Sequence, residues 1–163
     1  IVGGHSFGGE LAFYLAARYP VSAVVTTAIP YRLKFPFNMP GLSLLRHFKK
    51  TWKKRLSFKE RARRRGAFYY DAMPTYGIVL LHEINALLES DLPRVTCPLL
   101  MVQSANEYLS HPRSVADIHR AVASSVKKTI FLDYDSHGIF YSGSEEKIYH
   151  ATAAFIRQYC NVI

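Results

Sequence analysis

The chain has 163 residues, of which 49% are apolar, and a mean hydropathy of −0.01. This size and composition predict one globular domain with a sizeable core and exclude an intrinsically disordered chain. No apolar run reaches the ~20 residues that span a bilayer. The two cysteines are too few for a disulfide framework and are expected to be buried thiols. We therefore expect a cytoplasmic protein, with association at a membrane surface left open.

The net charge of +9 is concentrated in one segment. Residues 46–65 contain eleven Lys and Arg residues and one acid, Glu60, so this segment alone carries +10. The remainder of the chain therefore carries −1. The basic character is a local feature and not a property of the whole surface.

Short apolar runs alternate with helical patterns at both ends of the chain. Leu11 and Leu15 recur at helical spacing, and Pro20 ends that pattern. In chain order, the predicted elements are the end of a strand at 1–2, a helix at 10–19, a strand at 21–29, a strand at 98–103, a helix at 114–123, a strand at 128–132 and a helix at 144–159. Such alternation predicts an α/β fold, a parallel sheet with crossover helices.

The alternation is interrupted between residues 31 and 92. This stretch is rich in prolines and aromatic residues, contains the basic segment, and predicts helices over roughly 48–70 and 76–88. We interpret it as a helical cap inserted over the carboxyl edge of the sheet, where open α/β sheets bind ligands. The expected division is an α/β core at 1–30, a cap at 31–92 and the core again at 93–163.

A serine motif follows the first predicted strand. Residues 4–8, Gly-His-Ser-Phe-Gly, match G-x-S-x-G with a strand before and a helix after. This arrangement predicts Ser6 as a nucleophile on a strained turn, with the Phe7 backbone N–H as an oxyanion donor. The alternative, a dinucleotide-binding loop, does not fit because the glycines lack the G-x-G-x-x-G spacing.

A serine of this kind requires an acid and then a histidine, each beyond a strand end. His137 follows the last predicted strand and is the expected base, with a surface-loop histidine as the alternative. Glu107 follows the strand at 98–103 and is the expected acid, with an ordinary exposed glutamate as the alternative. Asp133 and Asp135 lie too close to His137 in sequence to be preferred.

No metal or organic cofactor is expected. His82-Glu83 lacks the second histidine of a zinc-binding helix. A group of apolar and aromatic residues in the cap predicts an acyl pocket, with ordinary cap core as the alternative. The candidates are Phe35, Phe37, Met39, Tyr70, Met73 and Tyr76.

The Ser6 motif together with CPLLMVQSANEYLSHPRSVADIHRAVASSVKKTIFLDYDSHGIF, residues 97–140, resembles the carboxylesterase and monoacylglycerol-lipase branch of the bacterial α/β-hydrolases. The likeness covers the motif and residues 93–160. In that branch an aspartate stands four residues after the glutamine, whereas here Gln103 leads to Glu107. The resemblance implies hydrolysis of a carboxylic ester through an acyl-enzyme on Ser6. A catalytically inactive binding module, an acyltransferase and a carbon–carbon bond hydrolase share the fold and remain alternatives.

The resemblance also implies several strands before the serine motif, with a loop that donates a second oxyanion N–H. These strands are not among the 163 residues. We therefore expect the chain to be the C-terminal part of a hydrolase domain, inactive without an N-terminal half as its partner.

The basic segment predicts an amphipathic helix, because apolar residues flank its lysines and arginines. Such a helix can lie on an anionic membrane surface. The alternative is a solvated face of the cap, and nucleic-acid binding is the least expected role.

Overall fold

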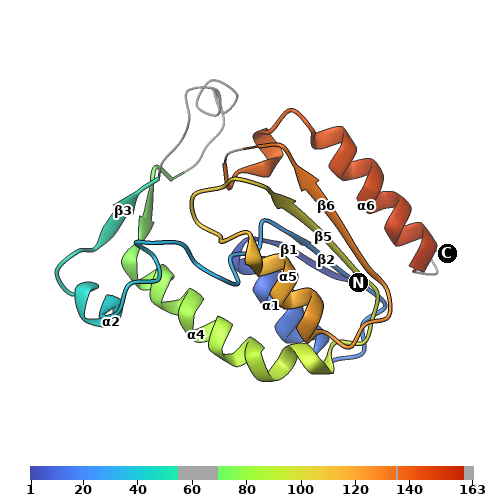
Figure 1. Ribbon diagram of the computed structural model, residues 1–163, viewed down its shortest axis with the longest axis horizontal. Helices are drawn as coiled ribbons and strands as arrows, with labels where there is room; N and C mark the ends of the chain where they lie inside the picture. Colours follow the sequence, from blue (N-terminus) through green and yellow to red (C-terminus); the bar gives the residue numbers. More distant parts are fainter. Residues whose placement is uncertain (55–69, 135, 160–163) are drawn as a thin grey trace.

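A computed structural model describes residues 1–54, 70–134 and 136–159 (Figure 1). Its centre is a four-stranded parallel sheet in the order β1-β2-β5-β6. The strands are β1 (Val2–His5), β2 (Val24–Thr27), β5 (Leu99–Ser104) and β6 (Lys127–Leu132). Within the described residues, β1 and β6 each pair along one side only. The α/β architecture predicted from the sequence is confirmed.

The burial of β5 explains its central place. All six residues of this strand are buried, as expected for a parallel strand covered on both faces. Leu99 and Met101 pack into the cluster formed with α1, α4 and α5. Leu100 and Val102 point to the opposite face and pack into clusters that contain Phe155 and Ile148 of α6. The period of two along the strand therefore supplies two separate core layers.

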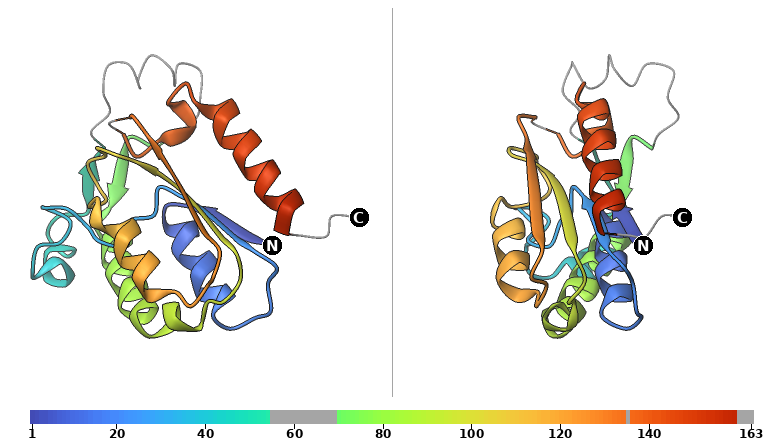
Figure 2. Two further views of the ribbon diagram at one scale, coloured as in Figure 1. Left: turned by 45° about the vertical axis from the view of Figure 1, so that its right-hand side comes forward. Right: turned by 90° about the vertical axis from the view of Figure 1, so that its right-hand side faces the viewer.

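Helices cover both faces of the sheet (Figure 2). On one face lie α1 (Phe7–Ala16), α4 (Thr75–Asp91) and α5 (Arg113–Ala121). The short 3₁₀ turn η1 (Leu92–Arg94) follows α4. On the other face lies α6 (Glu145–Tyr159), which η2 (Ile139–Tyr141) precedes. None of the helices in the described part of the chain has the length and apolar character needed to cross a bilayer.

Helix α1 begins at Phe7, earlier than the sequence pattern predicts, because its first glycines are part of the helix. A Cβ at Gly9 would lie 3.3 Å from Thr26 Cβ and 3.3 Å from Gly4 O. The glycine therefore allows the start of the helix to approach the sheet closely, a tertiary reason that outweighs its low helix propensity.

The helix predicted over residues 48–70 is wrong in its described part. Residues 51–53 form β3 (Thr51–Lys53), which pairs antiparallel with β4 (Ala72–Pro74), and residues 55–69 lie outside the described part. The β-forming residues Thr51 and Trp52 sit opposite a partner about twenty positions away, and a local pattern cannot detect such a pairing. The basic amphipathic helix is therefore also wrong for residues 46–54.

The inserted lobe, defined as residues 31–54 and 70–74, comprises α2 (Leu42–Leu45) and the β3–β4 hairpin. It lies at one end of the molecule, at the left in Figure 1, beyond the carboxyl ends of the strands. Leu33, Phe37 and Leu42 are buried and form one cluster with α4. The lobe thus has its own small core on the first turns of α4.

Candidate active site

Ser6 occupies a strained turn between β1 and α1. Its φ of 55° and ψ of −126° are rare for a residue with a side chain. The Ser6 N–H donates to Thr27 O at 2.8 Å, and Gly9 N–H donates to Ser6 O at 2.8 Å. These bonds hold the turn, and such strain persists where the surroundings fix it, often at functional sites.

The two glycines of the motif do not contribute equally to this turn. A Cβ on Gly4 would lie 2.1 Å from Gly8 O and 2.7 Å from Gly9 N, which no backbone tolerates. A Cβ on Gly8 would meet nothing within 4 Å among the described residues. The close approach therefore requires a glycine at position 4, whereas Gly8 contributes its backbone and not its lack of a side chain.

The three residues expected for a catalytic triad are hydrogen-bonded in series. His137 Nε2 lies 2.7 Å from Ser6 Oγ, and His137 Nδ1 is paired with Glu107 Oε2. Because a carboxylate only accepts, Nδ1 donates to Glu107, and in the neutral ring Nε2 then accepts from the Ser6 hydroxyl. Ser6, His137 and Glu107 follow β1, β6 and β5, whose carboxyl ends meet at one edge of the sheet.

Gln103 is a site residue whose role the sequence does not reveal. Its Nε2 donates to Glu107 Oε1 at 2.6 Å, and both side chains are buried. The two oxygens of Glu107 therefore have separate partners, Gln103 and His137, so the carboxylate is held in one orientation. The signal in the sequence is the four-residue spacing between Gln103 and Glu107 across the end of β5.

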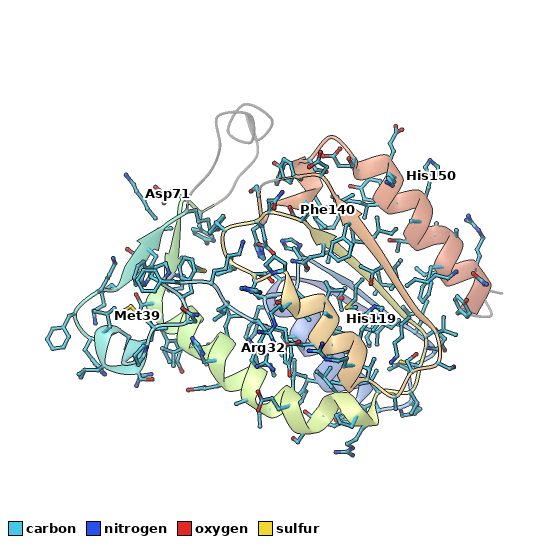
Figure 3. All side chains as sticks on the ribbon, viewed as in Figure 1. Arg32, Met39, Asp71, His119, Phe140 and His150 are labelled. Atoms are coloured by element: carbon cyan, nitrogen blue, oxygen red, sulfur yellow. The ribbon has the colours of Figure 1, made fainter. Side chains whose placement is uncertain are left out.

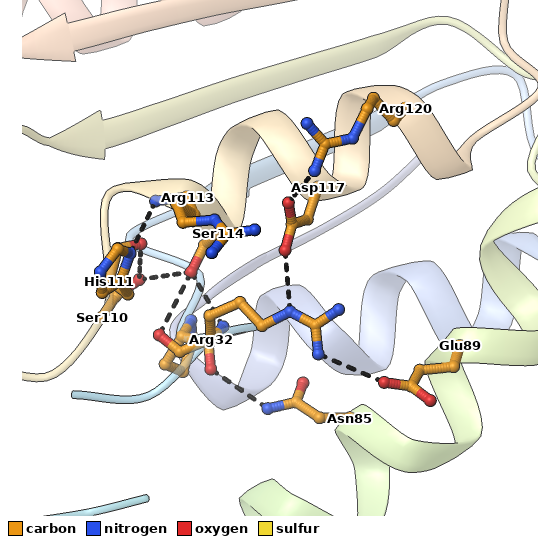
Figure 4. A network of polar contacts seen from close by, with 10 residues as sticks. Arg32, Asn85, Glu89, Ser110, His111, Arg113, Ser114, Asp117 and Arg120 are labelled. Carbon is orange, nitrogen blue, oxygen red and sulfur yellow. Dashed lines mark hydrogen bonds and ion pairs between the residues drawn. The ribbon is translucent and has the colours of Figure 1, made fainter. Parts of the chain in front are cut away.

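The loop that carries Glu107 is tied to the start of the inserted lobe. Lys34 Nζ donates to Glu107 O at 2.6 Å, and Ser110 Oγ donates to Ile29 O at 3.0 Å. Figure 4 shows the adjoining network, in which Arg32 N–H donates to Ser114 Oγ at 2.9 Å. The residues after β2 thus fix the position of the loop that carries Glu107.

Arg32 also joins two helices in this network. Its Nε donates to Asp117 on α5 at 2.9 Å and its Nη1 to Glu89 on α4 at 3.2 Å. The hydrogen bond from Arg32 holds the pKa of the Asp117 carboxyl below its usual range. Since Glu89 and Arg32 are largely exposed, this ion pair adds orientation more than stability.

Ser6 and His137 open into a cavity of about 700 Å³ between the sheet edge and the inserted lobe. Its wall is mainly apolar and has a polar part from the β3–β4 hairpin. The lining residues are His5, Ser6, Phe7, Thr51, Lys54, Tyr70, Asp71, Ala72, Met73, Pro74, Gly77, Leu80, Leu81, Tyr108, Leu109 and His137.

Two of the six expected pocket residues, Tyr70 and Met73, line this cavity. Phe37 is buried behind it against Trp52 and Tyr108, and Met39 packs in the same cluster. The other two, Phe35 and Tyr76, are exposed at 78% and 54%. Composition alone could not separate these sets, because an aromatic residue suits a pocket wall, a core and a surface cation–π contact equally.

No protein-family model matches the sequence, and no curated protein matches it significantly. Among solved structures, one reported with the metagenome-derived lipolytic enzymes LipS and LipT superposes with a TM-score of 0.77 at 25% identity. The match covers 96% of this chain and 64% of that structure. The chain has the α/β-hydrolase fold.

Two further α/β-hydrolase structures support the same fold. A monoacylglycerol lipase from Paleococcus ferrophilus superposes with a TM-score of 0.77 at 14% identity, covering 96% of this chain and 67% of that one. A soluble variant of monoglyceride lipase from Saccharomyces cerevisiae superposes with a TM-score of 0.74 at 15% identity, covering 98% and 62%. This chain thus spans about two thirds of the length of these α/β-hydrolases.

The residue before Ser6 also faces the site. His5 Nδ1 is hydrogen-bonded to Thr27 Oγ1 at 3.0 Å, and its ring centroid lies 5.2 Å from that of His137. Phe140, labelled in Figure 3, packs on the same His5 ring. His5 therefore packs beside the ring of His137 and supports it.

A buried carboxyl lies one turn along α1 from Ser6. Glu10 is fully buried, and burial raises the pKa of its carboxyl to about 9, against a smaller lowering by the Asn85 side chain. Glu10 is therefore neutral at pH 7. Among the described residues, no group of three or more His, Cys, Asp or Glu side chains is arranged to hold a metal ion.

Proposed function

We propose that this protein hydrolyses carboxylic esters through an acyl-enzyme on Ser6. The observation that carries the proposal is the hydrogen-bonded series from Glu107 through His137 to Ser6, at a strained turn in the wall of an apolar cavity. Serine, imidazole and carboxylate in this relation activate a hydroxyl for acyl transfer. Lipases, esterases and an enol-lactonase among the structural neighbours support the same reaction class.

In the first half-reaction, His137 Nε2 takes the Ser6 proton while Oγ bonds to the ester carbonyl carbon. The Phe7 N–H, the first of α1, donates to the resulting oxyanion, and the positive end of the helix adds to this stabilisation. Glu107 stabilises the imidazolium. His137 then returns the proton to the alkoxide, the ester C–O bond breaks, and the alcohol leaves.

In the second half-reaction, water takes the place of the alcohol. His137 accepts a proton from the water, whose oxygen bonds to the acyl carbon and forms a second tetrahedral intermediate. The bond to Ser6 Oγ breaks, Oγ regains the proton from His137, and the carboxylic acid leaves. Every proton is exchanged through His137, so no further acid or base is needed.

The cavity wall favours a substrate with an apolar acyl chain of small to medium length. Leu80, Leu81 and Met73 provide apolar surface, whereas Lys54 and Asp71 supply polar groups at the hairpin side. We propose that the acyl chain lies along α4 and that the alcohol part of the ester lies towards the hairpin.

The test is labelling of the full-length protein with a fluorophosphonate probe, which reacts only with an activated serine. We expect stoichiometric labelling at Ser6, none in Ser6→Ala, and turnover of p-nitrophenyl esters with a preference for short to medium chains. A folded wild-type protein that neither labels nor turns over any ester overturns the proposal in favour of a binding module. The matched control is Thr27→Ser, which keeps a hydroxyl that can hydrogen-bond to His5 Nδ1. This variant should retain labelling.

A further inference from the structure

Apolar and basic side chains are exposed together on the inserted lobe. Residues 41–54 contain five Lys and Arg residues and no acid. Phe48 is 80% exposed and Leu44 68% exposed, and Lys49, Lys50 and Lys53 are exposed beside them. We call Leu44, Phe48, Lys49, Lys50 and Lys53 the basic–apolar patch. Large apolar side chains exposed in such a group indicate an interaction surface for another molecule or a membrane.

The core of the lobe holds this patch in place. Lys49 Nζ lies 3.6 Å from the centroid of the Trp52 ring, and that ring packs on Phe37 at 5.7 Å. The Thr75 N–H donates to Lys50 O at 2.9 Å and joins the patch to the start of α4. The cations are therefore presented by a packed scaffold, which lowers the entropy lost on binding.

The patch and the cavity share the β3–β4 hairpin. Thr51 and Lys54 flank Trp52 and Lys53 in the chain and line the cavity. Tyr70, at the other side of the hairpin, lines the cavity and is 73% exposed, so the cavity reaches solvent there. Figure 3 shows Asp71 and Met39 on this lobe, away from His150 of α6. A surface bound to the patch would lie beside the cavity opening.

We propose that the basic–apolar patch docks the protein on an anionic lipid surface. Lysines attract lipid phosphates and carboxylates, while Leu44 and Phe48 can enter the boundary between headgroups and acyl chains. The phosphates of a nucleic acid could pair with the lysines, but a nucleic acid offers no apolar layer into which Leu44 could insert. The proposal concerns binding alone and does not depend on the proposed function.

The test is co-sedimentation of the full-length protein with phosphatidylcholine vesicles that contain about 30% phosphatidylserine, an anionic surface of the kind the lysines favour. We expect binding that weakens with salt and is lost on pure phosphatidylcholine. Lys49→Gln/Lys50→Gln/Lys53→Gln should weaken it on the order of a hundredfold, at about fivefold per cation. The matched control, Arg94→Gln/Lys147→Gln/Arg157→Gln, removes three exposed cations elsewhere and should change it less than about threefold.

Two further variants separate lost binding from lost folding. Lys50→Gln/Lys53→Gln keeps the Lys49 contact with Trp52 and should weaken binding about thirtyfold with an unchanged thermal melt. Leu44→Ser/Phe48→Ser should weaken it at least about tenfold. Equal binding to neutral vesicles, binding by the triple variant at the wild-type level, or binding to DNA but not to vesicles overturns the proposal. Hydrolysis of a water-soluble ester, measured in parallel, reports separately on the proposed function.

Discussion

His137 Nε2 lies 2.7 Å from Ser6 Oγ, although 131 positions separate the two residues in the chain. They follow β6 and β1, the two outer strands of the described sheet, which are three strand spacings or about 14 Å apart. The loop after β6 must therefore cross the ends of β5 and β2. Ala105 N–H donates to Leu132 O at 3.0 Å, and Ser104 Oγ donates to Tyr134 O, which directs the loop across the sheet.

Removal of either member of this pair tests the proposed chemistry. Ser6→Ala and His137→Gln should each lower kcat for p-nitrophenyl esters by about 10⁴-fold or more, and the double variant should lose little beyond the single ones. The reason is that the two side chains act as one unit. Steady-state kinetics of the purified variants give the measurement. Losses that multiply in the double variant would show that the residues act separately.

Glu107 is expected to fix the tautomer of His137. Glu107→Gln keeps the shape but can donate its amide to Nδ1, which favours the wrong tautomer and should lower kcat by about 10³- to 10⁴-fold with KM little changed. Gln103→Leu removes the hydrogen-bond partner of Glu107 Oε1 and should lower kcat by about 10- to 100-fold. Ester turnover measures both. A Glu107→Gln enzyme with wild-type kcat would exclude Glu107 as the acid.

The unequal glycines of the serine motif predict opposite effects of one substitution. Gly4→Ala places a Cβ 2.1 Å from Gly8 O and should destabilise the protein by about 3 kcal/mol or more, with loss of Ser6 labelling. Gly8→Ala, inside α1, should be neutral or stabilise it by about 0.5–1 kcal/mol. Urea unfolding of both variants provides the comparison, and equal destabilisation would contradict the packing described for the turn.

The buried Glu10 predicts a pH dependence of stability. Burial raises the pKa of its carboxyl from 4.5 to about 9, so the folded state holds a proton that the unfolded state releases. The contribution of Glu10 to the free energy of unfolding is fully present below pH 4.5 and is lost progressively as the pH rises towards 9. The Glu10→Gln side chain is neutral at every pH. The free energy of unfolding of this variant should exceed that of the wild type by roughly 3 kcal/mol at pH 7 and should equal it near pH 4. Other groups titrate equally in both proteins, so parallel unfolding curves across this range would contradict the prediction.

The serine motif is a local feature, and the order serine, acid, histidine can be read along the chain. The sequence alone was therefore sufficient to predict the α/β fold and to nominate Ser6, Glu107 and His137. Short apolar runs and helical spacing report on immediate neighbours, which is why α1, β5, α5, β6 and α6 were predicted to within a few residues. Tertiary structure decided what depends on contacts between distant segments. The β3–β4 pairing, the orientation of Glu107 by Gln103 and the division of cap aromatics between cavity, core and surface all arise there. A pairing partner twenty or more positions away leaves no periodic trace in the chain, because its energy is set by packing that exists only in the folded protein.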